Sequence, residues 1–140
     1  MHSAIDAATL RAYRDTHYRV RGDTPMTLRI DQPSPALAAL HQVHGVDCSA
    51  FITAANPHSR RCGDDANARR QLALAQDLER MGLAAMAAAG EHPSNGWPAE
   101  PSFLVPGLSL HDARMLGEKY GQNAVVWSGA DAVPRLVLLR

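Results

Sequence analysis

Cysteine is scarce in this chain of 140 residues, which contains only Cys48 and Cys62. Two thiols are too few for the disulfide framework that stabilises many small secreted domains. A chain of this length buries enough apolar surface to fold without such a framework. We therefore expect a cytoplasmic protein with reduced cysteines.

Net charge and long apolar runs are also missing. Fourteen basic and fourteen acidic side chains cancel, and aromatic residues make up only 5% of the chain. A neutral chain has no overall field that attracts nucleic acid, and few rings are present to stack on bases. No apolar run approaches the roughly 18 residues of a transmembrane helix, and the first residues lack the pattern of a secretion signal. We expect one domain over residues 1–140, with no membrane, nucleic acid or cofactor as a partner; the oligomeric state is left open.

What the sequence does contain is a series of strand and helix patterns. Residues 17–21 and 26–30 alternate in polarity around a turn and predict a β-hairpin. Ser34, Pro35 and Gly45 have the residue types of a helix cap, first turn and stop. The other predicted elements are a helix from a Ser3–Asp6 capping box to about Arg14, strands at 51–55, 102–105, 123–127 and 135–139, helices at 64–82 and 110–120, and a loop at 92–101. The last two strands, which flank a turn at 128–131, predict a second antiparallel hairpin. Residues 83–88 fit a strand or a helix, and the flanking glycines favour the strand.

The longest predicted helix follows the strand at 51–55 and ends at Gly82. Asp64 or Asp65 would cap it by accepting free amide hydrogens. The residues expected to face the core recur at helical spacing: Leu72, Ala75, Leu78 and Met81.

The order of these elements indicates the fold class. Strands joined by tight turns pair in the antiparallel direction, and strands and helices do not alternate one for one. We therefore predict an α+β domain with a mainly antiparallel or mixed sheet of five to seven strands and three to four helices packed on it. A doubly wound parallel sheet is the less favoured alternative.

Several short motifs stand in an order and spacing that resembles a bacterial family known as a domain of unknown function. The resemblance covers most of the chain from about Tyr18 and implies no activity. The motifs are YRV at 18–20, ITAANPHS at 52–59, NARRQL at 67–72, WPAEPSFLVPG at 97–107 and YGQNAVVW at 120–127.

Polar side chains gather around the loop that joins the strand at 51–55 to the longest helix. Loops of this kind often hold ligand sites, and the free amides of a helix start favour anions. Asn67 and Arg70 share a helical face because they are three residues apart, and an arginine fork suits a phosphate or carboxylate group. We predict a site for a small anionic ligand formed by Asn56, Ser59, Asn67, Arg70, Glu100 and Gln122.

Two alternatives involve the same residues. Glu100 could be the proton carrier of a small enzyme if an apolar setting beside Trp97 raised its pKa. In a purely structural role, Arg70 would pair with Glu100 or Asp65, and Asn56 would hold the turn.

Histidines and cysteines invite a metal or thiol interpretation. The candidates are His41, His44 and Cys48, with His58 as a further one, but their spacing matches no standard zinc pattern. We expect no bound metal, a half-buried histidine and a buried core cysteine. Cys62, beside two arginines, is the better candidate for a reactive thiol.

A third alternative uses the basic face of the first hairpin. Arg19, Arg21 and Arg29 could bind a protein or a nucleic acid backbone. Solvated charges on a sheet edge also prevent aggregation, and the neutral net charge favours that simpler role.

Overall fold

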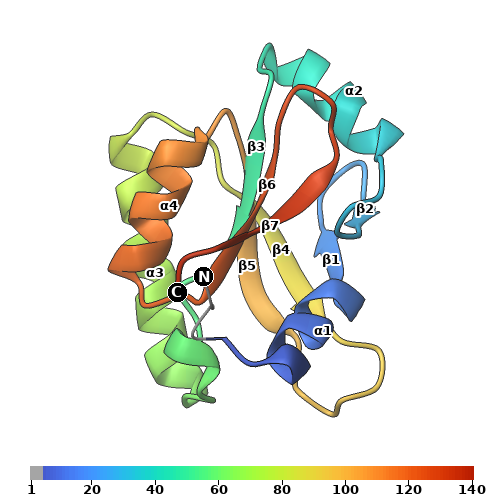
Figure 1. The fold of residues 1–140 in the computed structure, drawn as a ribbon. Helices are drawn as coiled ribbons and strands as arrows, with labels where there is room; N and C mark the ends of the chain where they lie inside the picture. The colour runs from blue at the N-terminus through green and yellow to red at the C-terminus, as the bar shows by residue number, and fades with distance from the viewer. Residues whose placement is uncertain (1–4) are drawn as a thin grey trace.

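The seven strands form one antiparallel sheet in the order β2-β1-β4-β5-β3-β6-β7. The computed structural model describes residues 5–140, and Figure 1 shows the sheet curling between its helices. The observed fold confirms the predicted α+β class, and the sheet is antiparallel throughout. The strands are β1 (His17–Val20), β2 (Met26–Leu28), β3 (Ser49–Ile52), β4 (Met86–Glu91), β5 (Glu100–Pro106), β6 (Ala124–Ser128) and β7 (Pro134–Leu138).

Both predicted hairpins are present at the two edges of the sheet. In the first, Tyr18 lies opposite Leu28, and both side chains are buried as the alternating pattern requires. In the second, Val126 lies opposite Leu136. The hairpins place the N-terminal and C-terminal strands at opposite ends of the sheet order.

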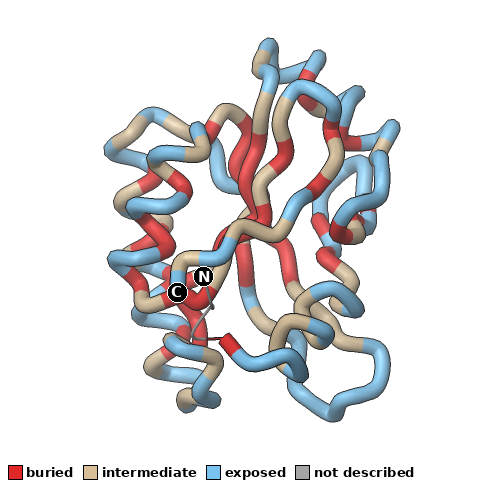
Figure 2. The backbone as a smooth tube through the Cα atoms, in the orientation of Figure 1, coloured by how far each residue is buried: buried red, intermediate tan, exposed pale blue. Residues whose placement is uncertain are grey.

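Helices cover both faces of the sheet and create two hydrophobic clusters. One cluster joins Leu37 of α2 and Tyr13 of α1 to Phe51 and Leu104 of the sheet, and the other joins the sheet to α3 and α4. Figure 2 shows buried residues along the strands and on the inner sides of the helices. The helices are α1 (Ala7–Asp15), α2 (Pro35–His44), α3 (Asp64–Arg80) and α4 (Leu110–Lys119), with a short 3₁₀ turn η1 (Pro57–Ser59) before α3.

Helix α2 begins and ends as its sequence predicts. The Ser34 hydroxyl accepts a hydrogen bond from the backbone N–H of Leu37, Pro35 is the first helical residue, and Gly45 adopts the left-handed conformation at φ 64°. These three residues satisfy the free backbone groups at the two ends of the helix.

Helix α3 corrects two predictions. Its N-cap is Gly63, and neither Asp64 nor Asp65 caps it; both aspartates lie in the first turn, where their charge favours the helix dipole. Leu72 is 60% exposed, whereas Leu78 is buried and Met81 packs on the core as predicted, so the buried face is shifted from the predicted stripe only in the first part of the helix. The buried residues of α3 are Asn67, Gln71, Leu74 and Leu78.

Two buried amides on α3 explain the shifted phase. Oε1 of Gln71 accepts a hydrogen bond of 2.6 Å from the backbone N–H of Ala54, and Asn67 bonds to Asn56 in the same way. Polar side chains that bond the backbone N–H groups after β3 therefore lie on the buried face of α3. A pattern based on apolar residues alone would not place them there.

Several element boundaries differ from the predicted ones. Strand β3 ends at Ile52 rather than residue 55, and β4 confirms the strand expected at 83–88 but runs from Met86 to Glu91. The predicted loop at 92–101 ends early, because Glu100 begins β5. Asp6 alone caps α1; the predicted partner Ser3 lies outside the described residues.

Candidate functional site

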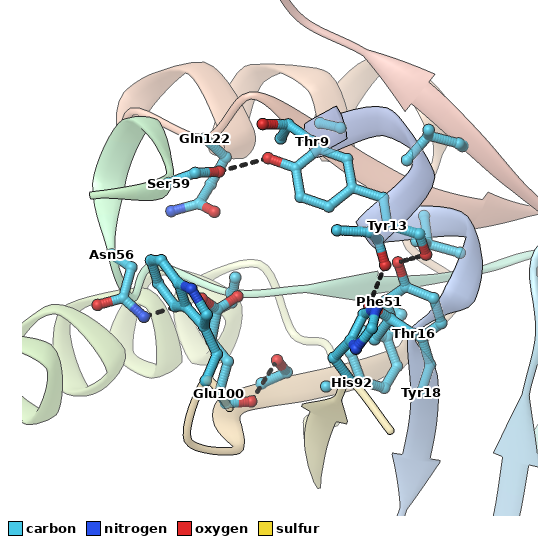
Figure 3. Close-up of a pocket in the computed structure, with 18 of the residues that line it drawn as sticks. Thr9, Tyr13, Thr16, Tyr18, Phe51, Asn56, Ser59, His92, Glu100 and Gln122 are labelled. Atoms are coloured by element: carbon cyan, nitrogen blue, oxygen red, sulfur yellow. Dashed lines mark hydrogen bonds between the residues drawn. The ribbon is translucent and has the colours of Figure 1, made fainter. Parts of the chain in front are cut away.

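A cavity of about 450 Å³ lies between α1 and the face of the sheet that carries Tyr18 and Phe51. The end of β3, the η1 turn and the β4–β5 loop complete its walls. Figure 3 shows Asn56 and Glu100 on one side and Tyr13, Thr16 and Tyr18 on the other. Its apolar floor includes Phe51, Ile52, Val125, Val126 and Leu136, and its polar lining includes Thr9, Tyr13, Asn56, Ser59, His92, Glu100 and Gln122.

Strand pairing places a glycine in the wall of this cavity. Tyr18 of β1 lies opposite Gly90 of β4, and Gly90 lies opposite Glu100 of β5. Residues in one such row project to the same face of a sheet. Gly90 therefore lies between Tyr18 and Glu100, and a Cβ at residue 90 would lie 3.6 Å from Cγ2 of Thr16, which also lines the cavity.

Asn56 links the carboxyl of Glu100 to α3. Its Nδ2 donates to Oε2 of Glu100 over 2.9 Å, and its Oδ1 accepts from the backbone N–H of Cys62 and from Nδ2 of Asn67, each over 2.9 Å. Oδ1 of Asn67 accepts the backbone N–H of Asn56 over 3.0 Å. The backbone N–H of Cys62 requires an oxygen at Oδ1, so the amide of Asn56 must present its nitrogen to Glu100.

Glu100 is held through one oxygen only. Oε2 accepts from Asn56, while within the described residues Oε1 has no hydrogen-bond partner. Burial raises the pKa of the Glu100 carboxyl above its ordinary value, and the hydrogen bond from Asn56 opposes this by stabilising the charged form. Glu100 therefore offers a free carboxyl oxygen to the cavity.

The loop that carries Asn56 has an unusual backbone. Asn56, His58 and Ser59 have positive φ angles of 49°, 57° and 57°. Left-handed conformations cost most residues energy and cluster at functional sites. Gly121 accommodates the loop: its carbonyl accepts the N–H of His58 over 2.8 Å, and a Cβ at residue 121 would lie 3.0 Å from Cβ of Pro57.

A hydroxyl pair joins α1 to this loop. The hydroxyls of Tyr13 and Ser59 are hydrogen-bonded to each other, and Nδ2 of Asn123 donates to both, over 3.1 and 3.0 Å. The Tyr18 hydroxyl donates to the carbonyl of Tyr13 over 2.7 Å. The contacts of Tyr13 thus hold α1 over the cavity.

The structure brings together four of the six predicted site residues. Asn56, Ser59, Glu100 and Gln122 line the cavity, and Nε2 of Gln122 donates to the carbonyl of Ala55 over 3.0 Å. Asn67 is buried behind Asn56 and orients it. Arg70 is exposed and does not line the cavity.

Sequence reasoning missed the wall formed by Tyr13, Tyr18, Gly90 and His92. The role of Gly90 depends on strand register, which no local pattern encodes. A tyrosine at residue 13 on the polar surface of a short helix carried no signal. His92 does have a local sequence signal, because it lies in a turn typical of this composition. Its Nδ1 accepts the N–H groups of Ser94 and Asn95.

The proposed metal and thiol candidates have structural partners. His41 is buried rather than half-buried, and its Nε2 is hydrogen-bonded to the Ser49 hydroxyl over 2.8 Å. Cys48 is only partly buried, and its thiol faces the carbonyl of Leu108. Burial raises the pKa of the Cys48 thiol, which disfavours the reactive thiolate. Over residues 5–140, no group of three or more His, Cys, Asp or Glu side chains is arranged to hold a metal ion.

The basic face of the first hairpin is partly neutralised. Arg19 forms an ion pair with Glu91, and Arg29 is partly buried and bonded to Nε2 of His17 over 3.3 Å. Arg21 is exposed. Its role in binding a partner stays a prediction of the sequence.

Comparison with known proteins identifies the family. No curated protein and no solved structure matches the chain. No helix in the described part of the chain is both long and apolar enough to cross a membrane. A family model described as "Protein of unknown function (DUF3293)" matches residues 52–125, which include Asn56, Asn67 and Glu100 but not Tyr13 or Tyr18. Because this match covers more than half of the chain, the protein belongs to the DUF3293 family of proteins of unknown function.

Proposed function

We propose that the cavity under α1 binds a small organic ligand and that Glu100 fixes its orientation. Ligand sites have volumes of roughly 300–1,000 Å³, a mainly apolar lining and a few placed polar groups. The cavity of about 450 Å³ fits this description. The observation that carries the proposal is Oε1 of Glu100, which has no hydrogen-bond partner among the described residues although Glu100 lines the cavity.

The charge that we propose for the ligand differs from the negative charge predicted from the sequence. A phosphate or carboxylate site depended on Arg70, which lies outside the cavity. Among the described residues that line the cavity there is no lysine or arginine. We therefore retain Asn56, Ser59, Glu100 and Gln122 as site residues and drop the requirement for a negative charge.

A fragment screen by thermal shift tests the proposal. A ligand that binds the folded state raises its melting temperature. Ala12→Phe would occupy part of the cavity, whereas Ala7→Phe places the same ring on the same helix outside it. We expect fragments to stabilise the native protein and Ala7→Phe but not Ala12→Phe. Equal shifts in all three proteins would contradict binding in the cavity.

A second candidate function is a small enzyme with Glu100 as its proton carrier. The raised pKa and the free Oε1 favour it, since a general acid or base needs a pKa near the working pH. If the bound fragments include substrates, nuclear magnetic resonance of the fragment mixture will show product formation. Glu100→Gln would then abolish turnover while retaining binding.

We also propose that the protein functions in a bacterial cytoplasm. Free Cys48 and Cys62 support a reducing compartment, and the motif resemblance supports a bacterial source. Growing bacterial cells would be fractionated and the protein detected in each fraction with an antibody, which would test both statements.

A further inference from the structure

We infer that the ligand is a small aromatic amine whose protonated nitrogen meets Oε1 of Glu100 and whose ring lies among Tyr13, Tyr18, Phe51 and Trp97. This inference rests on the proposed function, because it names the chemical class that the cavity would take. Three independent features support it. The charged residues of the lining are acidic, the amide groups of Gln122 and Asn123 already donate to other protein groups, and aromatic residues form part of the wall.

The charge of the lining favours a cation. Its carboxyl residues are Asp6 and Glu100, and among the described residues that line it there is no lysine or arginine. Asp6 is already engaged, since its Oδ1 accepts the N–H of Thr9 over 2.7 Å at the start of α1. Asp6 is exposed, whereas Glu100 is partly buried and its Oε1 has no hydrogen-bond partner among the described residues. A ligand ammonium group would supply the missing positive partner, and a charged hydrogen bond of this kind is stronger than a neutral one.

Two amide donors near the cavity, those of Gln122 and Asn123, are already used, which disfavours an anion beside them. Nε2 of Gln122 donates to the carbonyls of Ala55 and Tyr120. Nδ2 of Asn123 donates to the hydroxyls of Tyr13 and Ser59. A carboxylate or phosphate would find neither of these two amides free and would lie beside the Glu100 carboxyl, where like charges repel.

The aromatic residues suit a ring and a cation together. Tyr18 and Phe51 meet edge to face, with ring centres 5.1 Å apart and an interplanar angle of 75°. Trp97 lines the cavity and is 44% exposed, so its ring is available at the entrance. Aromatic faces attract cations and bury an apolar ring at the same time.

The test uses the full chain and a matched ligand set. Phenethylamine, phenylacetamide and phenylacetate share a ring and differ in charge, and homologues with spacers of one to three carbons extend each class. We expect the best amine to bind at least tenfold more tightly than its amide and carboxylate counterparts by calorimetry at pH 7.5. Tighter binding of the amide or carboxylate class would overturn the inference.

Glu100→Gln supplies the decisive control. Glutamine keeps the acceptor for Asn56 and removes the charge, so the fold is retained. We expect amine affinity to fall at least tenfold and amide affinity to change less than threefold. An amine affinity that survives this substitution would also overturn the inference. The experiment distinguishes failure of this inference from failure of the proposed function. If the proposed function is wrong, no fragment of any class binds; if only this inference is wrong, fragments of other classes still bind in the cavity.

Discussion

Asn56 donates a hydrogen bond from Nδ2 to Oε2 of Glu100 over 2.9 Å, and this contact joins the loop after β3 to the first residue of β5. The two residues are 44 positions apart in the chain. The contact therefore exists only because β3 and β5 are neighbours in the sheet. It holds a partly buried cavity carboxyl whose second oxygen has no hydrogen-bond partner among the described residues, and the predictions below test its surroundings.

Asn56→Asp should destabilise the protein at neutral pH by about 1–3 kcal/mol, the usual cost of a lost buried partner. The new carboxylate would face Glu100 instead of donating to it, and like charges at this distance repel. Urea denaturation at pH 7 measures the loss. Asn56→Gly tolerates the left-handed backbone and removes only the side chain, so it should be less harmful than the aspartate. An aspartate variant as stable as the native protein would show that the contact is absent.

Alanine substitutions of Asn67 and Arg70 should affect stability very differently, although the two residues are three positions apart on one helix. Asn67→Ala removes both hydrogen bonds to Asn56 and should cost about 1–3 kcal/mol of unfolding free energy. Arg70→Ala changes an exposed side chain and should alter stability by less than about 0.5 kcal/mol. Fragment binding should follow the same order. A large effect of Arg70→Ala on binding would restore the arginine to the site.

The pH dependence of stability should reveal the raised pKa of Glu100. A carboxyl with a raised folded-state pKa stabilises fully below its unfolded pKa, near 4.5, and this contribution is lost as the pH rises through the folded value. Each unit of elevation corresponds to about 1.4 kcal/mol. Denaturation curves between pH 4 and pH 8 should show native stability falling relative to Glu100→Gln. A constant difference across that range would contradict burial of the carboxyl.

Tyr13→Phe should loosen α1 over the cavity. The change removes a hydroxyl that bonds Ser59 and Asn123 and keeps the ring. A loss of about 1 kcal/mol corresponds to roughly fivefold faster amide exchange in α1. Hydrogen exchange with mass spectrometry measures this, and Arg11→Ala, on the exposed side of the same helix, serves as the control. Equal exchange in the native protein and Tyr13→Phe would show that the hydroxyl does not hold the helix.

Gly121→Ala should destabilise the loop that carries Asn56. Alanine in a left-handed conformation costs roughly 1–2 kcal/mol, and its Cβ would also press on Pro57. Gly45→Ala is the matched control, since φ is 64° there against 69° and a Cβ meets open space. The excess loss of Gly121→Ala over Gly45→Ala measures the close approach of the loop. Equal losses would mean that the loop moves freely.

Local chemistry determined much of this fold from the sequence. The caps of α2 at Ser34 and Gly45, both hairpins and the α+β class follow from residue types at short spacing. Local patterns failed where a distant partner decided the outcome. Leu72 is exposed and Gln71 buried because the end of β3 needs an acceptor for the N–H of Ala54.

The sequence by itself also identified the polar loop and Glu100, since strand-to-helix loops and isolated carboxyls have a recognisable chemistry. Only the tertiary structure decided that Arg70 lies outside the cavity and that Gly90 lies between Tyr18 and Glu100 in its wall. The reason is physical. A change of one residue in strand register moves a side chain to the other face of the sheet. Which residues line a cavity therefore depends on which strands pair, and that pairing is set by the whole core.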